Sequence, residues 1–474
     1  MKPSARSSWT VKPWLCGIVG AVLVVACLGA GCPSNNDPQT GPPPAGPGDG
    51  ARDVYASPNG LSTNDGTRAQ PLDLATALSS RSPVGPGRTV WLLGGTYRAG
   101  VTSQLVGRAD APIVVRPAPG ERVVLDGANP EAIGRGVVLT VLGAHTWFWG
   151  FEVTFSSDTR TDTGRPSEPN GIFVNESTGV RFINLIVHDV PGQGLGVWAE
   201  SVGVEVYGAI IYHNGTNHFD HGIYTQNSTD TKRLEDNVIF GQASHGIHAF
   251  GSSSVSLDHF QISGNVSFNN GLLVGAPERN ILVGGGRVAR DLTLTQNFTY
   301  YPLASGGSNN IGYEAGCADA TVTDNYFAGR NALTLIRCSP GEMSRNVLVG
   351  GWDPADLPAQ YPANTYQPSL TSGVHVAVRP NRYERGRAHV IVYNWALQSQ
   401  VAVDLSASGL RSGEQYEIRD IQNLFGTPVA TGTFTGAEVV LPMTGLRTAL
   451  PTWRNAVLPR HTAPEFAVFL VQPR

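Results

Sequence analysis

The chain has 474 residues, of which 15% are charged, and its formal net charge is −4. This length exceeds what one compact core usually holds, so a single small domain is excluded and two folded units with extensions are expected. The only lysines are Lys2, Lys12 and Lys232. No basic stripe is present, and we therefore expect no nucleic-acid partner.

Residues 1–31 combine a basic start with an apolar run from Trp14 to Ala26, which predicts a lipoprotein-type signal peptide. Val24-Val25-Ala26-Cys27 resembles a bacterial lipobox, so Cys27 is the expected lipidation site and Cys32 the second candidate. A cleaved signal or an uncleaved anchor is the alternative. We expect an extracytoplasmic protein, either anchored to the outer membrane or cell surface through lipid or secreted. Residues 32–52 are rich in proline and glycine and predict a disordered linker.

A repeat dominates residues 53–352. Asparagine or, once, Gly208 precedes a short apolar strand at intervals of 21 to 32 residues, with a second strand after it and a third strand before it. Three strands per repeat without intervening helices predict an all-β fold, a right-handed parallel β-helix. The expected asparagine ladder consists of Asn184, Asn237, Asn265, Asn297, Asn325 and Asn346.

We interpret these asparagines as structural. Asparagine tolerates positive φ at a tight bend better than other residues with a side chain, and glycine at position 208 fits the same requirement. Stacking of successive coils brings the amides about 4.8 Å apart, close enough to form a column of hydrogen bonds.

The opening segments resemble those of a known superfamily. Tyr55-Ala56-Ser57-Pro58-Asn59-Gly60 and Asn64-Asp65-Gly66-Thr67, followed by Gly94-Gly95-Thr96-Tyr97 and Pro112-Ile113-Val114-Val115, are similar to entry segments of the pectate-lyase-like right-handed parallel β-helix proteins. The resemblance implies this solenoid for residues 53–352 and a carbohydrate-active protein. It leaves the reaction open, because such solenoids also carry hydrolases, epimerases and adhesins.

The C-terminal part has a different pattern. Residues 353–373 hold four prolines and predict a strap that leaves the solenoid. Residues 374–474 alternate apolar with polar positions, which predicts a β-sandwich. We expect it to cap the solenoid or to bind sugar, and it shows no acidic pair or histidine cluster that would indicate catalysis.

Strand alternation assigns the faces of the solenoid. An aliphatic column that includes Ile172, Ile223, Ile247, Ile281 and Ile311 must fill the interior, so every following residue points outward. Aromatic and polar residues on one exposed face suit pyranose rings. The two outward columns are Phe173, Gly196, Tyr224, His248, Leu282, Gly312 and Thr334, then Asn175, Trp198, Gln226, Phe250, Gly284, Glu314 and Ile336. From the second column we expect Trp198, Gln226, Phe250 and Glu314 to bind substrate.

Histidine is concentrated beside that face, with six of eleven between positions 188 and 248. Because imidazole exchanges protons near neutral pH, the expected catalytic residues are His221, Tyr224, His245, His248 and Asp220. β-Elimination on an acidic, uronate-containing polysaccharide is the predicted reaction. Lys232, Arg233 and Arg330 are candidates to neutralise the substrate carboxylate, although Lys232 is expected to be a solvated charge.

The sequence leaves other functions and metal sites open. Hydrolysis needs two carboxyl groups, for which Asp189 and Asp220 fit better than Asp220 and Glu314, and a non-catalytic lectin or adhesin would use the same aromatic face. No cofactor is firmly implied. Zinc on the histidines is less favoured, and calcium on Asp189, Asp220 or Glu314 is possible. We expect a monomer.

Cys317 and Cys338 follow consecutive strands at nearly the same offset, 21 residues apart. One coil of separation suits a disulfide, which would lock the end of the solenoid in an oxidising compartment.

Overall fold

The computed structural model describes residues 52–128, 136–161, 164, 166, 169–304, 306, 308–370 and 372–474. The predicted signal peptide, both candidate lipidation sites Cys27 and Cys32, and the linker up to residue 51 lie outside the described residues. Of the helices in the described part, none has the length and apolar character needed to cross a bilayer.

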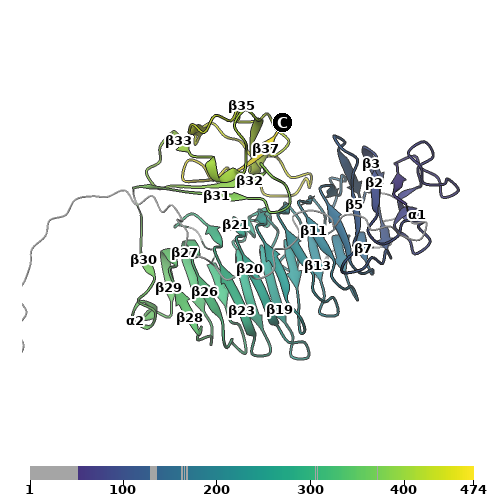
Figure 1. Cartoon of the computed structure of the whole chain (residues 1–474). Coiled ribbons are helices and arrows are strands. Elements are labelled where there is room, and N and C mark those ends of the chain that lie inside the picture. Colours follow the sequence, from purple (N-terminus) through teal and green to yellow (C-terminus); the bar gives the residue numbers. More distant parts are fainter. Residues whose placement is uncertain are drawn as a thin grey trace, which may run out of the picture. The chain divides into compact units, whose positions relative to one another are not determined.

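Parallel strands form three strips that run the length of a right-handed β-helix, which confirms the predicted fold class (Figure 1). Each coil passes from strip 1 to strip 2 to strip 3 before rising to the next coil. Strip 1 consists of β1 (Val54–Ala56), β2 (Thr89–Leu92), β5 (Ile113–Pro117), β8 (Thr146–Trp149), β11 (Arg181–Ile183), β14 (Glu205–Tyr207), β17 (Lys232–Glu235), β20 (Asp258–Ser263), β23 (Arg290–Thr295), β26 (Thr321–Thr323) and β28 (Glu342–Ser344).

The other two strips belong to one 19-stranded sheet and meet in the long strand β27 (Tyr326–Leu335). Besides β27, strip 2 consists of β3 (Gly95–Arg98), β6 (Val123–Asp126), β9 (Glu152–Thr154), β12 (Ile186–His188), β15 (Ile210–Tyr212), β18 (Val238–Phe240), β21 (Val266–Phe268), β24 (Phe298–Tyr300), β29 (Val347–Asp353) and β30 (Thr365–Gln367). Strip 3 consists of β4 (Val101–Ser103), β7 (Val137–Val141), β10 (Asn170–Val174), β13 (Leu195–Val197), β16 (Ile223–Thr225), β19 (Ile247–Gly251), β22 (Ile281–Gly285) and β25 (Ser308–Ile311).

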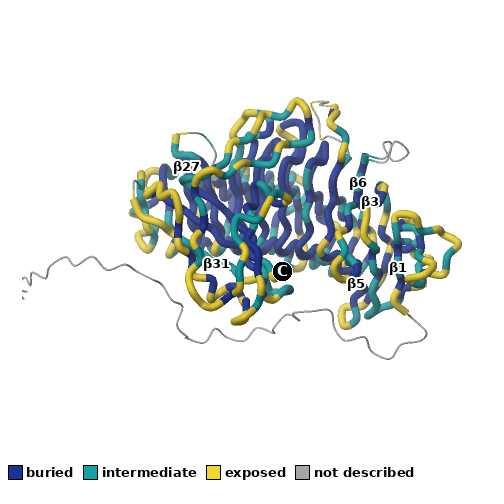
Figure 2. The backbone as a smooth tube through the Cα atoms, turned by 90° about the horizontal axis from the view of Figure 1, so that it is seen from above, coloured by how far each residue is buried: buried dark blue, intermediate teal, exposed yellow. Residues whose placement is uncertain are grey.

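The interior of the solenoid is filled by stacked aliphatic side chains. Ile172, Leu195, Ile223, Ile247 and Ile281 are fully buried, and Figure 2 shows the strands as a continuous buried body. Burial of such a side chain contributes about 1.5 to 3 kcal/mol. A short helix, α1 (Leu74–Leu78), packs its leucines against the first coils.

An internal asparagine ladder holds one turn of successive coils together. It begins at Asn237 and continues one coil further than expected, to Asn364, with side-chain hydrogen bonds of 2.7 to 3.0 Å between neighbours. Each amide also donates to a backbone carbonyl, as Asn265 does to Leu234 O. Asn184 lies outside this ladder and pairs with Asn381 instead.

The positive-φ explanation is correct only for Asn184 and Gly208. In the later coils the residue with positive φ directly precedes the asparagine, for example Asp236 before Asn237 and Asp324 before Asn325. The ladder asparagines are therefore selected by their buried amide hydrogen bonds and not by backbone conformation.

The last coil differs from the predicted strap. The segment after β29 contains α2 (Leu357–Gln360) and then β30, which pairs in parallel with β29. The parallel stack thus continues to Gln367. Cys317 and Cys338 occupy the same position on neighbouring coils and form the predicted disulfide, with their Cα atoms 4.5 Å apart.

The C-terminal residues form two antiparallel sheets that pack on each other, as the alternating pattern predicted. The larger sheet consists of β31 (Val374–Pro380), β32 (Ala388–Asn394), β37 (Phe466–Pro473), β34 (Gln415–Asp420) and β35 (Ala430–Thr433), and the smaller of β33 (Gln400–Val403) and β36 (Val439–Pro442).

This sandwich shares an apolar core with the outer face of strip 2. Tyr393 donates a 3.0 Å hydrogen bond to Thr299 O, Trp395 donates a 2.8 Å bond to Tyr326 Oη, and Phe466 stacks on Tyr300. The sandwich therefore covers strip 2, whereas outward side chains of strip 3 such as Tyr224 stay partly exposed.

Candidate functional site

Three columns of outward residues cross the coils of strip 3 from β13 to β22, and we call this surface the coil face. One column lies just before the strands. Its members are aligned because the backbone carbonyl of each accepts a hydrogen bond of 2.9 to 3.0 Å from a backbone N–H of the preceding coil. The strand register aligns the second column, and the third follows two residues later. The columns are Gln193, His221, His245 and Arg279, then Gly196, Tyr224, His248 and Leu282, then Trp198, Gln226, Phe250 and Gly284.

Buried amides fix the loops that carry the histidines. Asn214 donates a 3.1 Å hydrogen bond to Gln242 Oε1, and Gln242 donates a 2.7 Å bond to Ile211 O. On the next coil Asn270 donates to Asn280 Oδ1 at 2.9 Å. These bonds hold successive turns in register, and the strands that follow therefore present their side chains at matching heights.

The structure brings three of the predicted residues, His221, His245 and His248, into one cluster, the histidine trio. One ring nitrogen of each lies within 4.8 Å of the others. His221 Nε2 and His248 Nδ1 share a 2.8 Å hydrogen bond, and the His221 ring stacks on that of His245 with centroids 5.0 Å apart. Among the described residues, His221 Nδ1 has no hydrogen-bond partner although it is buried.

Burial keeps the histidine trio neutral. It lowers the pKa of His248 to about 3, and together with the neighbouring imidazoles it holds the pKa values of His221 and His245 well below the ordinary value for histidine. Neutral imidazoles can accept a proton or ligate a metal ion.

Tyr224 lies beside the histidine trio at the centre of a row of rings. Its ring stacks on His221 at 5.6 Å and meets the edge of Trp198 at 5.4 Å. Its hydroxyl accepts a 3.3 Å hydrogen bond from Gln226 Nε2, and burial raises its pKa. The row continues through Phe173 on one side and through Phe250 and Tyr313 on the other.

Gly196 opens a small cradle next to Tyr224. A Cβ atom at this position would lie 3.7 Å from Trp198 Nε1 and 3.9 Å from Gln193 Oε1. Both of these polar atoms are buried, and neither has a hydrogen-bond partner among the residues that the structure describes. A buried donor and a buried acceptor thus lie on either side of a position without a side chain, and a ligand hydroxyl that approaches Gly196 could bond to both.

On the opposite side of Tyr224, the coil of β22 contributes a charged pair. Glu278 Oε2 lies 3.3 Å from His245 Nδ1 and 3.0 Å from Arg279 Nη1. The backbone N–H of Arg279 also points to His245 Nδ1 at 3.3 Å. These two contacts of His245 require different tautomers, because Nδ1 accepts the backbone proton of Arg279 in one and donates its own proton to Glu278 in the other.

Asp220 does not belong to this constellation. It is fully buried, and its Oδ2 accepts hydrogen bonds from the Thr216 backbone and hydroxyl at 2.9 and 3.2 Å and from the Asn217 backbone at 3.3 Å. The described contacts of this carboxylate are within its own loop, so they do not support the predicted catalytic role of Asp220.

Glu314 was placed on the coil face by a register that is wrong by two residues. Ile311 pairs with Val283 and not with Ile281, because the buried Asn309 occupies the inward position opposite Ile281. Asn309 is stabilised there by donating to Thr299 Oγ1 and Ala332 O at 2.7 and 2.8 Å. Glu314 is exposed, and Tyr313 is the residue in contact with Phe250.

The predicted cations also lie elsewhere. Lys232 is fully buried and not solvated, and its Nζ donates to the carbonyls of Trp198 and Gln226. Burial lowers its pKa to about 7. Arg233 is on strip 1, paired in register with Glu205, and the exposed Arg330 sits where β27 passes between strips.

The alternatives based on carboxylates lose support as well. Asp189 is buried between His188 and Arg160, at 2.8 and 3.2 Å, and accepts from Thr452 N at 2.7 Å. Asp189, Asp220 and Glu314 do not form a shared cluster among the described residues, so a calcium site that combines them is not supported.

Gln193 and Arg279 of the coil face, and Glu278 beside it, were not among the residues predicted from the sequence. A signal was available, because Gln193, His221, His245 and Arg279 each directly precede a Gly or Asn that comes just before a strand of strip 3. The outward alternation starts only after that residue, so His221 and His245 were chosen as histidines and their neighbours Gln193 and Arg279 were not recognised as part of the same column.

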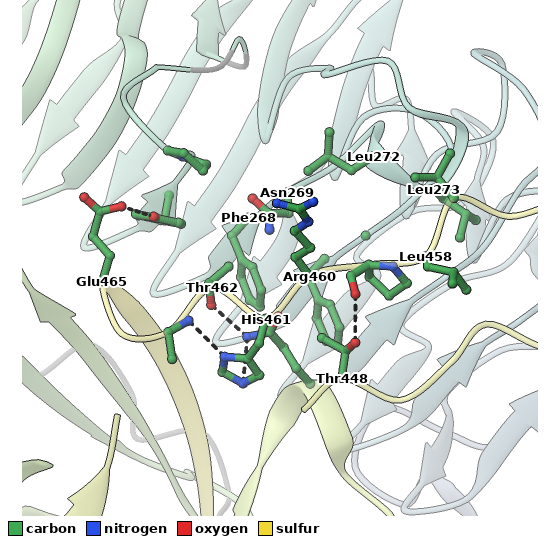
Figure 3. Close-up of a pocket in the computed structure, with 18 of the residues that line it drawn as sticks. Phe268, Asn269, Leu272, Leu273, Thr448, Leu458, Arg460, His461, Thr462 and Glu465 are labelled. Atoms are coloured by element: carbon green, nitrogen blue, oxygen red, sulfur yellow. Dashed lines mark hydrogen bonds between the residues drawn. The ribbon is translucent and has the colours of Figure 1, made fainter. Parts of the chain in front are cut away.

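A separate cavity of about 640 Å³ lies between the solenoid and the sandwich. Figure 3 shows its wall, with Phe268 and Leu272 from the solenoid and Arg460 and His461 from the sandwich side. His461 pairs with Asp420 at 2.9 Å. Because its lining is mainly apolar and this histidine is already paired, we assign the cavity no chemistry.

Comparisons with known proteins give structural similarity only. No protein-family model matches the chain, and no curated protein matches its sequence. Similar solved structures include a pectate lyase (19% identity, 58% of this chain and 80% of that chain, TM-score 0.40) and a lacto-N-biosidase from Eubacterium ramulus (14%, 67% and 68%, TM-score 0.41). An alginate lyase from a Paenibacillus species is similar over 67% of this chain and 98% of its own (18%, TM-score 0.38). Because these TM-scores are below 0.5, we base no functional inference on them.

Proposed function

We propose that this protein is a carbohydrate-active enzyme that cleaves an acidic, uronate-containing polysaccharide by β-elimination on the coil face. One observation carries the proposal. Tyr224 contacts Trp198, which stands beside the side-chain-free Gly196, on one side and the histidine trio on the other, and His245 of the trio contacts the loop of Arg279. These features stand on the coils of β13, β16 and β22, and the coil of β19 with His245 and His248 lies between the last two.

The aromatic row supports binding of an extended sugar chain. Coils are spaced by about 4.8 Å, so side chains on successive coils contact neighbouring parts of a linear ligand. Trp198 and Phe250 are half-buried and present ring surfaces that pack against the C–H faces of pyranoses. The cradle at Gly196 then receives a hydroxyl, which accepts from Trp198 Nε1 and donates to Gln193 Oε1.

The chemistry follows from the groups at the centre of the row. In β-elimination the proton on the carbon beside the uronate carboxylate is removed, a double bond forms, and the bond to the leaving glycosidic oxygen breaks as that oxygen receives a proton. We assign the proton exchange to Tyr224, which the histidine trio flanks. Arg279 binds the carboxylate of a neighbouring sugar by a charge-assisted hydrogen bond.

Hydrolysis is less well supported. It needs two carboxyl groups about 5 to 10 Å apart that face the scissile bond. Asp189 and Asp220, the predicted pair, are buried and engaged by turn and loop groups.

A panel of acidic and neutral glycans tests the proposal. The lyase reading predicts a new ultraviolet absorbance from unsaturated uronate, and it predicts that Tyr224→Phe loses this activity by at least about 100-fold. Tyr313→Phe, on the same row but away from the histidine trio, is the matched control and should retain most activity. Reducing ends without the absorbance would indicate a hydrolase, and retention without cleavage would indicate a lectin or adhesin.

We also propose that the enzyme acts outside the cytoplasm. The predicted lipobox at Cys27 supports this, and the Cys317–Cys338 disulfide is typical of oxidising compartments. A Cys27→Ser protein should move from the membrane to the aqueous phase on fractionation, and continued membrane partitioning would point to Cys32 or to an uncleaved anchor.

A further inference from the structure

We infer that His221, His245 and His248 form a binding site for a divalent transition metal ion. Three imidazole nitrogens already lie within 4.8 Å of one another, from two adjacent coils. A tetrahedral zinc ion with bonds of about 2.0 to 2.1 Å needs its ligand nitrogens roughly 3.4 Å apart. Small rotations of the rings therefore bring the histidine trio to this geometry.

The contacts of the trio favour a metal over a purely structural cluster. The trio is stabilised by one 2.8 Å hydrogen bond between two imidazoles, yet His221 Nδ1 stays without a partner among the described residues in a buried position. Metal ligation requires neutral imidazole, the form that burial favours here.

Glu278 supplies the support that metal-bound histidines usually have. A ligating imidazole typically donates its other N–H to a carboxylate, which fixes the tautomer and the ring orientation. Glu278 Oε2 lies 3.3 Å from His245 Nδ1, so a His245 that ligates through Nε2 donates to this carboxylate. Glu278 also offsets the charge of Arg279, its 3.0 Å partner, next to the site.

The ligand type and number indicate the class of metal and its role. Imidazole suits Zn²⁺, Cu²⁺, Ni²⁺ or Fe²⁺ and not Ca²⁺ or Mg²⁺. Three protein ligands leave one position open, as in catalytic zinc sites. A uronate carboxylate can take that position beside Tyr224. This catalytic part rests on the proposed function, whereas metal binding itself does not.

Calorimetric titration of the chelator-treated, dialysed protein with ZnCl₂, without glycan, tests the site. We expect one Zn²⁺ per chain, and we expect Co²⁺ to give the visible bands of a tetrahedral complex. His245→Ala and His248→Ala should each weaken Zn²⁺ binding by at least about 100-fold, and Glu278→Gln by about 10- to 100-fold. His259→Ala is the matched control, because His259 is half-exposed and paired with Asp291 on strip 1.

Folding of each variant is checked by its thermal unfolding, and Glu278→Gln keeps the test valid if a histidine variant fails to fold. No Zn²⁺ uptake by the wild-type chain, or uptake unchanged in Glu278→Gln and His248→Ala, would overturn the metal site. If the chelator-treated protein takes up no Zn²⁺ but keeps its lyase activity, the metal site is overturned and the proposed function is not. Stoichiometric Zn²⁺ binding without uronate cleavage supports the metal and contradicts the proposed function.

Discussion

Gly196 matters because the coil face lacks a side chain there. Its φ lies outside the left-handed region, and a Cβ would meet its neighbours at ordinary contact distances. We therefore expect Gly196→Ala to fold normally and to fill the cradle, which weakens glycan affinity about tenfold through loss of the hydroxyl's two hydrogen bonds. Gly341→Ala, where the Cβ would enter open space, is the control. Equal affinity of both variants in isothermal titration would contradict the cradle.

His188 predicts a pH dependence of stability. It bridges Glu152 at 3.0 Å and Asp189 at 2.8 Å, and these carboxylates outweigh burial and raise its pKa to about 9. Because the pKa of His188 is higher in the folded than in the unfolded chain, its charged imidazole stabilises the fold fully below the unfolded-state pKa of about 6.5. This stabilisation is lost as the pH rises through the folded-state pKa of about 9. The loss is on the order of 3 kcal/mol.

Chemical denaturation between pH 6 and pH 10 measures this effect. The wild-type free energy of unfolding should fall over this window, and His188→Gln should lack most of the slope. A wild-type profile as flat as that of the variant would show that His188 is not charged in the folded protein.

For single residues, the sequence predicted which side chains point outward from the strands better than it predicted which polar side chains are buried. The outward positions of Tyr224 and His248 follow from strict alternation after an aliphatic residue, and this held wherever the inward column was aliphatic. It failed at Asn309, a buried amide that a hydrophobicity pattern does not recognise as inward, and the error moved Glu314 onto the wrong site. The prediction that Lys232 is solvated was also wrong, because hydrogen bonding of a buried lysine to two backbone carbonyls leaves no signal in the sequence composition.

The asparagine ladder decides how neighbouring coils are held together. Asn265 receives from Asn237, donates to Asn297 and caps Leu234 O, all within a fully buried turn. Removing it leaves several buried groups without partners, at about 1 to 3 kcal/mol each before relaxation. We expect Asn265→Gly to destabilise the protein by about 3 kcal/mol or more.

Asn184→Gly is the matched comparison. Asn184 has φ of +52° and lies outside the ladder, so glycine relieves its backbone while removing only the contact with Asn381. Its free energy of unfolding should change by less than about 1 kcal/mol. A loss for Asn265→Gly as small as that for Asn184→Gly in urea titrations would contradict the buried hydrogen-bond explanation of the ladder.

The period of the elements was recoverable from sequence because each coil repeats one strand-forming unit. The boundary at the C-terminal end of the solenoid could not be predicted from the sequence. Residues 353–367 lack apolar periodicity yet add the rung β30, since Asn364 extends the ladder by hydrogen bonding to Asn346. The ladder constraint is a hydrogen-bond pattern, and propensity alone does not reveal it.

In the described part of the chain, the C-terminal sandwich and the solenoid share one apolar core along strip 2. Phe466 is fully buried and stacks on Tyr300, with ring centroids 4.6 Å apart. Sequence alternation predicted the sandwich but not this docking, because an outward aromatic column of strip 2 looks the same whether it binds sugar or another domain.

Shared burial predicts a single cooperative unfolding transition. We expect Phe466→Ala to cost about 3 to 5 kcal/mol and to lower the melting temperature of the solenoid and sandwich together. Leu450→Ala, at a residue 69% exposed, should change little. Two separate calorimetric transitions in the wild-type protein would contradict a common core.

The most direct test of the central claim is a crystal structure of the Tyr224→Phe protein with the oligosaccharide that the glycan panel retains best. The sugar rings should follow the solenoid axis along Trp198 and Phe250, with a hydroxyl over Gly196 and a carboxylate near Arg279. Sugar bound only in the cavity beside Arg460, or only on strip 1, would contradict the assignment of the coil face as the site of action.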